Sequence, residues 1–335
     1  MPILSIFIVL FYLPKLFALD PYTHFTSLDL PPKSIGPESI ALDRFNQGPY
    51  IGISDGRILK YKGPNVGFVL FAYTSPNRYE RMKGFYELCD DVTDPNLGPT
   101  CGRPFGFSFN NFNGVLYIVD ALLGLFKVGP EGGLATLIAK SAGGVPFKFL
   151  NGIDVDQLTG DVYLTVASQT FDLRNVIQGN YVLDSTGRLI TYNPITKELK
   201  VLLDGLSIPA GPVVSTDRTF VLFSEFSTKT VKKYCLTGLK ANTTEALLNL
   251  PGNPVKIKRA PEPGKFWVAV NEIVQQQPRN ATPFGYKFDS FGEILLIKNL
   301  EDHYSNIIVN LVQEYNGGRV VVGSREVKFV GMYSK

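Results

Sequence analysis

The chain has 335 residues, of which 44% are hydrophobic and 19% are charged, and these proportions exclude a largely disordered chain and a solvated coiled coil. Its formal net charge is +3 with no long run of one sign, which excludes the strongly basic surface that nucleic-acid binding needs. Abundant Phe and Tyr (24 and 16 residues) together with abundant Gly and Pro (32 and 23) favour an all-β protein of short strands and tight turns.

The first predicted element is a leader. Residues 3–13 form an apolar run interrupted by a single Ser, and the small residue Ala18 follows shortly afterwards. The run is shorter than the roughly 20 apolar residues that cross a bilayer, so it predicts a secretory signal peptide over residues 1–18 rather than a membrane span. A first hydrophobic strand is the alternative. We expect no membrane span in the mature chain, 19–335.

The cysteines and glycosylation sequons agree with a secretory route. Cys89 and Cys101 flank a short loop rich in Pro and Asp, and we expect them to form a disulfide while Cys235 remains a buried thiol. Asn242 and Asn280 each begin an Asn-x-Thr sequon and are predicted glycosylation sites.

A strand, a polar turn and a second strand recur along the chain. The first strands of the six units begin in segments 39–43, 105–108, 153–156, 212–215, 255–258 and 310–313. The second strands lie in segments 50–53, 116–119, 162–164, 220–223, 266–269 and 320–323. Starts separated by a fairly regular interval, with further strand material between them, predict a single six-bladed β-propeller over residues 19–335. A pair of β-sandwiches is the alternative, but it does not explain the repeated unit.

Two insertions between the strands have partly helical patterns. They cover residues 78–88 and 172–178, and we expect them to lie over one mouth of the ring.

Several common catalytic motifs are absent or lack their context. The two histidines, His24 and His303, belong to no zinc-binding pattern, and no glycine-rich turn suits a phosphate. The segment 52–56 matches Gly-x-Ser-x-Gly, but a strand pattern follows it where a nucleophile elbow needs a helix, so a hairpin turn is predicted.

Residues near the starts of the innermost strands converge on the central channel of a propeller, and functional groups are expected there. Glu38, Asn151 and Glu225 carry the carboxylate and amide oxygens that Ca²⁺ prefers, which makes Ca²⁺ a candidate cofactor and Glu38 and Asn151 its candidate ligands. The alternative is that Glu38 and Asn151 hydrogen-bond to backbone groups in turns.

Sequence blocks spread over nearly all of the mature chain resemble the strictosidine synthase-like proteins of plants. The blocks are segments 55–57, 60–65, 71–73, 101–104, 116–120, 144–148, 186–189, 253–259, 266–268 and 287–295. The resemblance implies a six-bladed propeller, a bridge between Cys89 and Cys101, and a route through the endoplasmic reticulum to the vacuole, with an extracellular destination as the alternative.

The founding activity of that family is a Pictet-Spengler condensation of an amine with an aldehyde, in which an active-site glutamate handles the protons. In this chain the position of that glutamate falls on Asn310, which cannot take up a proton at ordinary pH. Glu314 and Glu225 are the candidate replacements. The resemblance also implies a pocket for a small organic substrate, whose candidate lining residues are Phe149, Asn151, Phe226 and Val309.

The segment 149–156 also resembles the wider superfamily of paraoxonases and gluconolactonases, whose axial cation is held by Glu and Asn at blade starts. Three functions follow as hypotheses. The first is hydrolysis of an ester or lactone, with a cation polarising the carbonyl. The second is an amine-aldehyde condensation with a substitute carboxylate, and the third is a non-catalytic binding or defence-related propeller.

Overall fold

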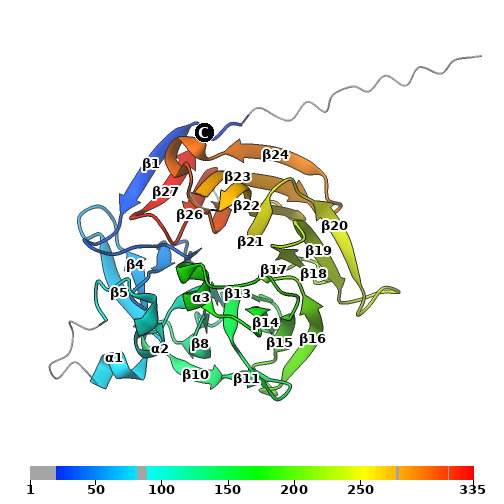
Figure 1. Ribbon diagram of the computed structural model, residues 1–335, viewed down its shortest axis with the longest axis horizontal. Coiled ribbons are helices and arrows are strands. Elements are labelled where there is room, and N and C mark those ends of the chain that lie inside the picture. Colours follow the sequence, from blue (N-terminus) through cyan, green and yellow to red (C-terminus); the bar gives the residue numbers. More distant parts are fainter. Residues whose placement is uncertain (1–19, 81–88, 277–278, 316) are drawn as a thin grey trace, which may run out of the picture.

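The computed structural model describes residues 20–80, 89–276, 279–315 and 317–335. Six small sheets surround a central axis, which confirms the predicted six-bladed β-propeller (Figure 1). The predicted signal peptide, 1–18, lies outside the described residues, as does most of the first predicted helical insertion.

The first three blades follow the chain from the N-terminal side. Blade 1 contains β2 (Ser39–Ala41), β3 (Tyr50–Gly52), β4 (Arg57–Tyr61), β5 (Phe68–Tyr73) and β9 (Gly133–Leu134). Blade 2 contains β6 (Pro104–Phe109), β7 (Leu116–Asp120), β8 (Gly124–Val128) and β10 (Thr136–Ala139). Blade 3 contains β13 (Phe149–Val155), β14 (Val162–Ser168), β15 (Gly187–Tyr192) and β16 (Leu199–Leu206).

The remaining blades complete the ring. Blade 4 contains β17 (Pro209–Val214), β18 (Phe220–Glu225), β19 (Thr230–Cys235) and β20 (Thr244–Asn249). Blade 5 contains β21 (Asn253–Arg259), β22 (Lys265–Gln276), β23 (Arg279–Asp289) and β24 (Ile294–Asn299). Blade 6 contains β25 (Leu311–Tyr315), β26 (Arg319–Gly323), β27 (Phe329–Ser334) and β1 (His24–Asp29). Each predicted strand-turn-strand unit supplies the inner two strands of one blade.

The ring closes by joining the two ends of the chain. β1 pairs antiparallel with β27, in register from His24 opposite Ser334 to Asp29 opposite Phe329. Blade 6 therefore takes three strands from the C-terminal end and its outermost strand from the N-terminal end. β1 covers the edge of β27 that would otherwise be unpaired.

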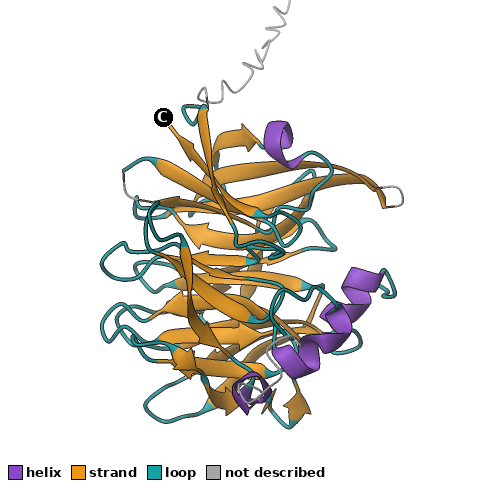
Figure 2. Cartoon of the chain, turned by 90° about the vertical axis from the view of Figure 1, so that its left-hand side faces the viewer, coloured by secondary structure: helices purple, strands orange, loops and turns teal. Residues whose placement is uncertain are grey.

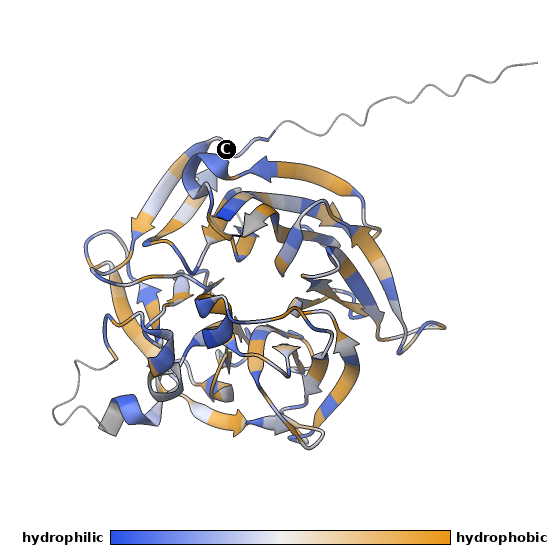
Figure 3. Ribbon diagram, in the orientation of Figure 1, coloured by the Kyte–Doolittle hydropathy of each residue, from blue (hydrophilic) through white to orange (hydrophobic). Residues whose placement is uncertain are grey.

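The hydrophobic core lies between the blades. Each of six clusters of buried side chains joins two neighbouring blades, such as the one in which Trp267 of blade 5 packs against Val312 of blade 6. Figure 3 shows the apolar residues concentrated in the strands, whereas many connecting turns are hydrophilic. Each blade is thus stabilised by burying apolar surface against both neighbours.

Glycines allow the innermost strands to approach one another near the axis. A Cβ on Gly152 would lie 2.5 Å from the backbone nitrogen of Gly211, and one on Gly211 would lie 2.4 Å from that of Ile257. Gly211 also has a φ of +50°, which side-chain-bearing residues rarely adopt. These two positions therefore fix the close spacing of blades 3, 4 and 5.

The insertions contain the short helices and the minor strands. They are α1 (Pro76–Glu80), the 3₁₀ helix η3 (Pro95–Leu97), α2 (Gly98–Cys101), β11 (Ser141–Ala142), β12 (Val145–Pro146), α3 (Leu173–Gln178) and α4 (Glu301–Tyr304). The expected disulfide joins Cys89 to Cys101, and Cys235 is a buried free thiol. No helix in the described part of the chain combines the length and the apolar character needed to cross a bilayer.

The predicted second helical insertion forms α3, and its ends carry clear signals. Asp172 caps its N-terminus by accepting a hydrogen bond from the Arg174 backbone, while the Asn175 side chain accepts one from the Asp172 backbone. Gly179 ends the helix in the left-handed conformation. α3 lies over the centre of the ring in Figure 1, and Figure 2 shows that it projects on the same side as the long β22–β23 hairpin.

Candidate functional site

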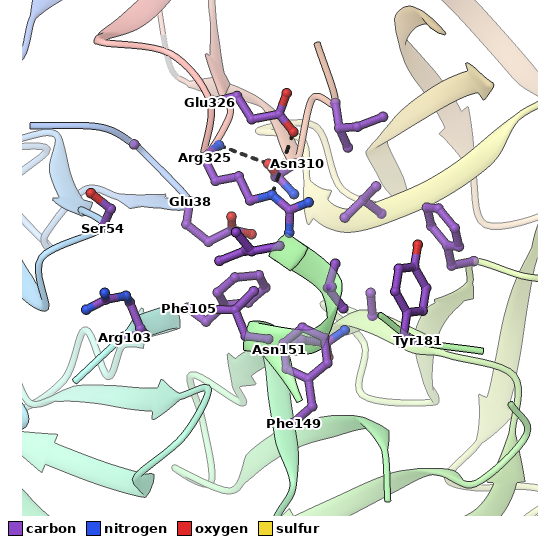
Figure 4. A pocket seen from close by; sticks show the side chains of 18 of the residues that line it. Glu38, Ser54, Arg103, Phe105, Phe149, Asn151, Tyr181, Asn310, Arg325 and Glu326 are labelled. Atoms are coloured by element: carbon purple, nitrogen blue, oxygen red, sulfur yellow. Dashed lines mark hydrogen bonds and ion pairs between the residues drawn. The ribbon is translucent and has the colours of Figure 1, made fainter. Parts of the chain in front are cut away.

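A pocket of about 650 Å³ occupies the axial mouth of the ring beneath α3 (Figure 4). Every blade contributes a residue at or near the start of its innermost strand. These residues are Glu38, Phe105, Asn151, Ala210, Val255 and Asn310. Because the innermost strands all start at this mouth, a repeated local position along the sequence becomes a single convergent site.

One wall of the pocket is aromatic. Phe149 of β13 contacts Phe105 edge-to-face, with ring centroids 5.4 Å apart, and also packs against Phe171 at 6.2 Å. Phe171 in turn packs against Tyr181 at 5.1 Å, and Phe226 also lines the pocket. α3 adds apolar side chains, including Leu173 and Val176. A ligand with a flat apolar body would be buried well here.

A lysine ammonium lies against this wall, 4.6 Å from the centroid of the Phe105 ring. Lys256 of β21 is 2% exposed, and its Nζ donates to the backbone oxygen of Glu38 (2.7 Å), to Glu38 Oε1 (2.9 Å) and to the backbone oxygen of Phe105 (2.6 Å). These contacts use all three protons of the ammonium. Burial raises the pKa of Glu38 and lowers the pKa of Lys256, while their mutual attraction opposes both shifts.

The surroundings of Glu38 and Asn151 do not suit the Ca²⁺ ion considered from the sequence. Ca²⁺ takes six to eight oxygen ligands, whereas Glu38 Oε1 already accepts from Lys256, and Asn151 Oδ1 accepts from Thr165 Oγ1 at 2.7 Å. The described residues contain no group of three His, Cys, Asp or Glu side chains that could hold a metal ion. A divalent ion at this point would also face the positive charge of Lys256, so these residues fit an internal ammonium rather than a metal.

Asn310 lines the pocket just before β25 begins. Its Oδ1 accepts a hydrogen bond from the backbone nitrogen of Arg325 at 3.0 Å, and its own backbone oxygen accepts one from the backbone nitrogen of Lys256 at 3.1 Å. The side chain therefore helps to hold the loop after β26. Its amide offers polar contact to a ligand but has no proton-accepting carboxylate.

Glu314 lies outside the pocket, because β25 carries it about 13 Å along the strand from Asn310. It accepts hydrogen bonds from Tyr22 Oη (2.6 Å), Trp267 Nε1 (3.0 Å) and Lys287 Nζ (2.7 Å), so it joins blades 5 and 6 to the N-terminal segment. Burial alone would raise its pKa, but these three donors outweigh that effect and lower it.

Two other predicted positions are also absent from the pocket lining. Glu225 is 2% exposed and is held by the Ser207 backbone nitrogen, Thr228 and an ion pair with Lys232 at 2.8 Å. Val309 is fully buried in the core between blades 5 and 6, and the preceding residue, Ile308, lines the pocket instead. Successive side chains of an extended segment point to opposite sides, so Ile308 faces the pocket while Val309 faces the core.

Charged residues that the sequence did not single out also line the pocket. Arg279 of β23 holds the Glu326 carboxylate with both guanidinium nitrogens at 2.8 Å. Arg325 also lines the pocket, next to Glu326 in the loop after β26. A lysine within an innermost strand is unusual, so the sequence could have indicated Lys256. Its partners in blades 1 and 2 are distant along the chain, so no local pattern predicts them.

The comparisons with known proteins agree on a family. A family model described as strictosidine synthase matches residues 151–239. Protein strictosidine synthase-like 12 of Arabidopsis thaliana is 40% identical over 310 residues, covering 92% of this chain and 89% of the relative. Strictosidine synthase of Catharanthus roseus is 40% identical over 289 residues, covering 85% of this chain and 79% of that protein.

Solved structures share the fold at low identity. The calcium-binding protein regucalcin from Agrobacterium tumefaciens has a TM-score of 0.63 at 13% identity and covers 93% of this chain and 94% of its own. A gluconolactonase from Xanthomonas campestris has a TM-score of 0.62 at 12% identity and covers 95% and 96%.

Proposed function

This chain belongs to the strictosidine synthase family, and on that premise we propose that it is an enzyme that binds a small, largely apolar organic molecule in its axial pocket. The observation that carries the proposal is the cavity itself. Its volume of about 650 Å³ falls within the range of small-molecule sites, and its wall combines aromatic side chains with a few polar groups.

The pocket favours hydrolysis over condensation of an amine with an aldehyde. The resemblance puts the family's glutamate position at Asn310, and Glu314, outside the pocket, belongs to the contact between blades 5 and 6. Two carboxylates line the pocket among the described residues, Glu38 and Glu326, and Arg279 holds both oxygens of Glu326. Glu38 is therefore the best candidate for acid-base work.

Glu38 has two properties of a general base. Its Oε2 is a buried acceptor without a hydrogen-bond partner among the described residues, so a water or substrate hydroxyl that donates to it is favoured. Burial also raises its pKa, which makes the carboxylate a stronger base than an exposed glutamate.

The proposed reaction is the hydrolysis of an ester or lactone. Glu38 removes a proton from a water molecule as the water oxygen bonds to the carbonyl carbon, and the carbonyl π electrons move to its oxygen. When this tetrahedral adduct collapses, the bond to the leaving oxygen breaks and Glu38 returns its proton to that oxygen. The step consumes one water and needs no metal ion.

The test is an assay of purified residues 19–335 on aryl esters and lactones, with and without a chelator. We expect Glu38→Gln to lower kcat/KM by at least about a hundredfold, which is the lower end of the contribution that general acid-base catalysis usually makes. We expect the chelator to leave the activity unchanged. The control is Asp156→Asn, which makes the same acid-to-amide change at a buried position at the opposite end of β13.

The pH profile provides a second readout. Activity should rise with pH through the pKa of Glu38, which lies above the value of about 4.3 for an ordinary glutamate. Full activity of a folded Glu38→Gln protein, or activity abolished by the chelator, would contradict the mechanism. Condensation of amine-aldehyde pairs without ester hydrolysis would favour the family's founding reaction instead.

We also propose that the protein follows the secretory route. The leader pattern over residues 1–18, the disulfide between Cys89 and Cys101 and the exposed side chains of Asn242 and Asn280 support this route. The endoplasmic reticulum and vacuole are the destinations that the resemblance suggests.

A further inference from the structure

The Arg325 guanidinium points into the pocket without a strong partner (Figure 4). Among the described residues, none accepts a hydrogen bond from its side chain, and its closest carboxylate contact is Glu326 Oε1, 3.7 Å from Nε. The Arg325 side chain is 24% exposed, so its donors are accessible from the cavity. An arginine in such a position can bind a planar anion through two parallel hydrogen bonds.

The neighbouring charges are already balanced without Arg325. Lys256 neutralises Glu38 at 2.9 Å, and Arg279 neutralises Glu326 with two contacts of 2.8 Å. The carboxylate nearest to Arg325 is therefore shared with a better placed arginine. Arg103 also lines the pocket, but its guanidinium donates to the backbone oxygens of Gly102 and Asp94. Arg325 is therefore the pocket arginine whose donors are left for a ligand, and its positive charge matches an anionic one.

The apolar wall lies across the pocket from this charge. In Figure 4, Phe149 and Tyr181 face Arg325 over the cavity, and the three come from separate parts of the chain. A ligand that spans the pocket would place an apolar body against the rings and an anionic end at the guanidinium.

We propose that the ligand of the axial pocket is an organic monocarboxylate with an apolar body, whose carboxylate binds Arg325. The inference rests on the proposed function and narrows its substrate class to esters or lactones that also carry a free carboxylate. It makes the pocket selective against cationic amines, because an amine would meet the positive charge of Arg325.

The test compares three probes of nearly equal shape and different charge. They are 3-phenylpropanoate, 3-phenylpropanamide and 3-phenylpropylamine, and their binding to the wild-type protein is measured by isothermal titration calorimetry at pH 7. We expect the Kd of the carboxylate to be at least about tenfold lower than that of the amide, as hydrogen bonds to charged groups typically give, and the amine to bind most weakly.

Three variants locate the preference. Arg325→Gln should bring the Kd values of carboxylate and amide together, and Arg325→Lys should keep part of the preference because it retains the charge but not the planar fork. Arg319→Gln is the matched control, since this exposed arginine begins β26 at the opposite end of the hairpin. It should leave the preference unchanged.

The outcomes separate the two proposals. Equal binding of carboxylate and amide to the wild-type protein would overturn the charge inference while leaving a small-molecule pocket in place, and this comparison does not depend on any variant folding. Failure of all three probes to bind would count against the pocket function itself. A preference that survives Arg325→Gln would also overturn the assignment to this residue.

Discussion

Lys256 illustrates how one side chain changes the chemistry available at the axis of a propeller. Its ammonium gathers oxygen atoms from blades 1 and 2 in the way that a bound cation would, but its charge is part of the chain. Glu38 is thereby fixed by one oxygen while the other stays without a partner. A protein built in this way can place a positive charge beside a buried carboxylate without depending on metal supply.

Some residues of the pocket could be predicted from the sequence, whereas the contacts between distant residues could not. The position of Asn151 near the mouth follows from the strand-turn-strand pattern, which is local, whereas Phe149 and Asn310 were expected there from the family resemblance. The pairing of Lys256 with Glu38 spans 218 residues along the chain, and no local pattern indicates which distant side chains meet. The orientation of Glu314 away from the pocket depends in the same way on Tyr22, 292 residues distant.

Glu314 leads to a prediction about stability and pH. Replacing it by Gln removes the ion pair with Lys287, and we expect a loss of about 1 to 3 kcal/mol in the free energy of unfolding at pH 7. Because the folded-state pKa of Glu314 is lowered, its contribution is complete above the unfolded value of about 4.3 and disappears as the pH falls through the folded value.

Urea unfolding of the wild type and Glu314→Gln between pH 7 and pH 3 would measure this difference. The stability gap should narrow toward pH 3. Glu245→Gln is the control, because its ion pair with Lys240 is exposed and should contribute little at any pH. A gap that stays constant down to pH 3 would contradict the assigned role of the ionised carboxylate.

At the scale of elements, the six repeated units were predictable because each inner hairpin carries its own alternation and turn residues. The expected hairpin over 52–56 is confirmed between β3 and β4. β1 was not predicted as a strand, since its burial pattern is mostly exposed and its partner β27 lies at the other end of the chain. The parallel pairing of β5 with the two-residue β9 is similarly too short and too distant to leave a sequence signal.

α3 should control access to the pocket through its N-terminal cap. A helix of only six residues has little stability of its own, so loss of the Asp172 cap in Asp172→Ala should cost about 1 kcal/mol locally. Since Leu173 and Val176 line the pocket, we expect a higher Kd for 3-phenylpropanoate and faster amide hydrogen exchange in α3.

The matched control for this variant is Asn193→Ala. Asn193 accepts hydrogen bonds from the Ile195 and Thr196 backbone in a turn at the opposite end of blade 3, so its loss should not affect the pocket. Unchanged binding and exchange in Asp172→Ala would show that packing on the aromatic wall, rather than the cap, holds α3 in place.

At the scale of the whole molecule, the ring depends on the strand contributed by the N-terminal side. Deleting residues 20–29 removes β1 together with Tyr22, whose burial alone is worth roughly 2 kcal/mol, and exposes the backbone edge of β27. We expect a lower melting temperature and self-association, measured by thermal unfolding and size-exclusion chromatography. The exposed pair Thr26→Ala and Ser27→Ala should change neither, and a deletion variant as stable as the wild type would mean that blade 6 is complete without β1.

The pairing of β1 with β27 also determines when the ring can close during synthesis of the chain. β1 is made among the first described segments, and its partner β27 is made about 300 residues later, so at roughly 5–20 residues per second it waits between about 15 and 60 s. During that interval the first five blades can assemble in order, each on its predecessor, while the opening strand has nothing to pair with. Synthesis of this chain must therefore be nearly complete before the ring can close. A stalled or truncated product would have an open ring, which chaperones or proteases could recognise.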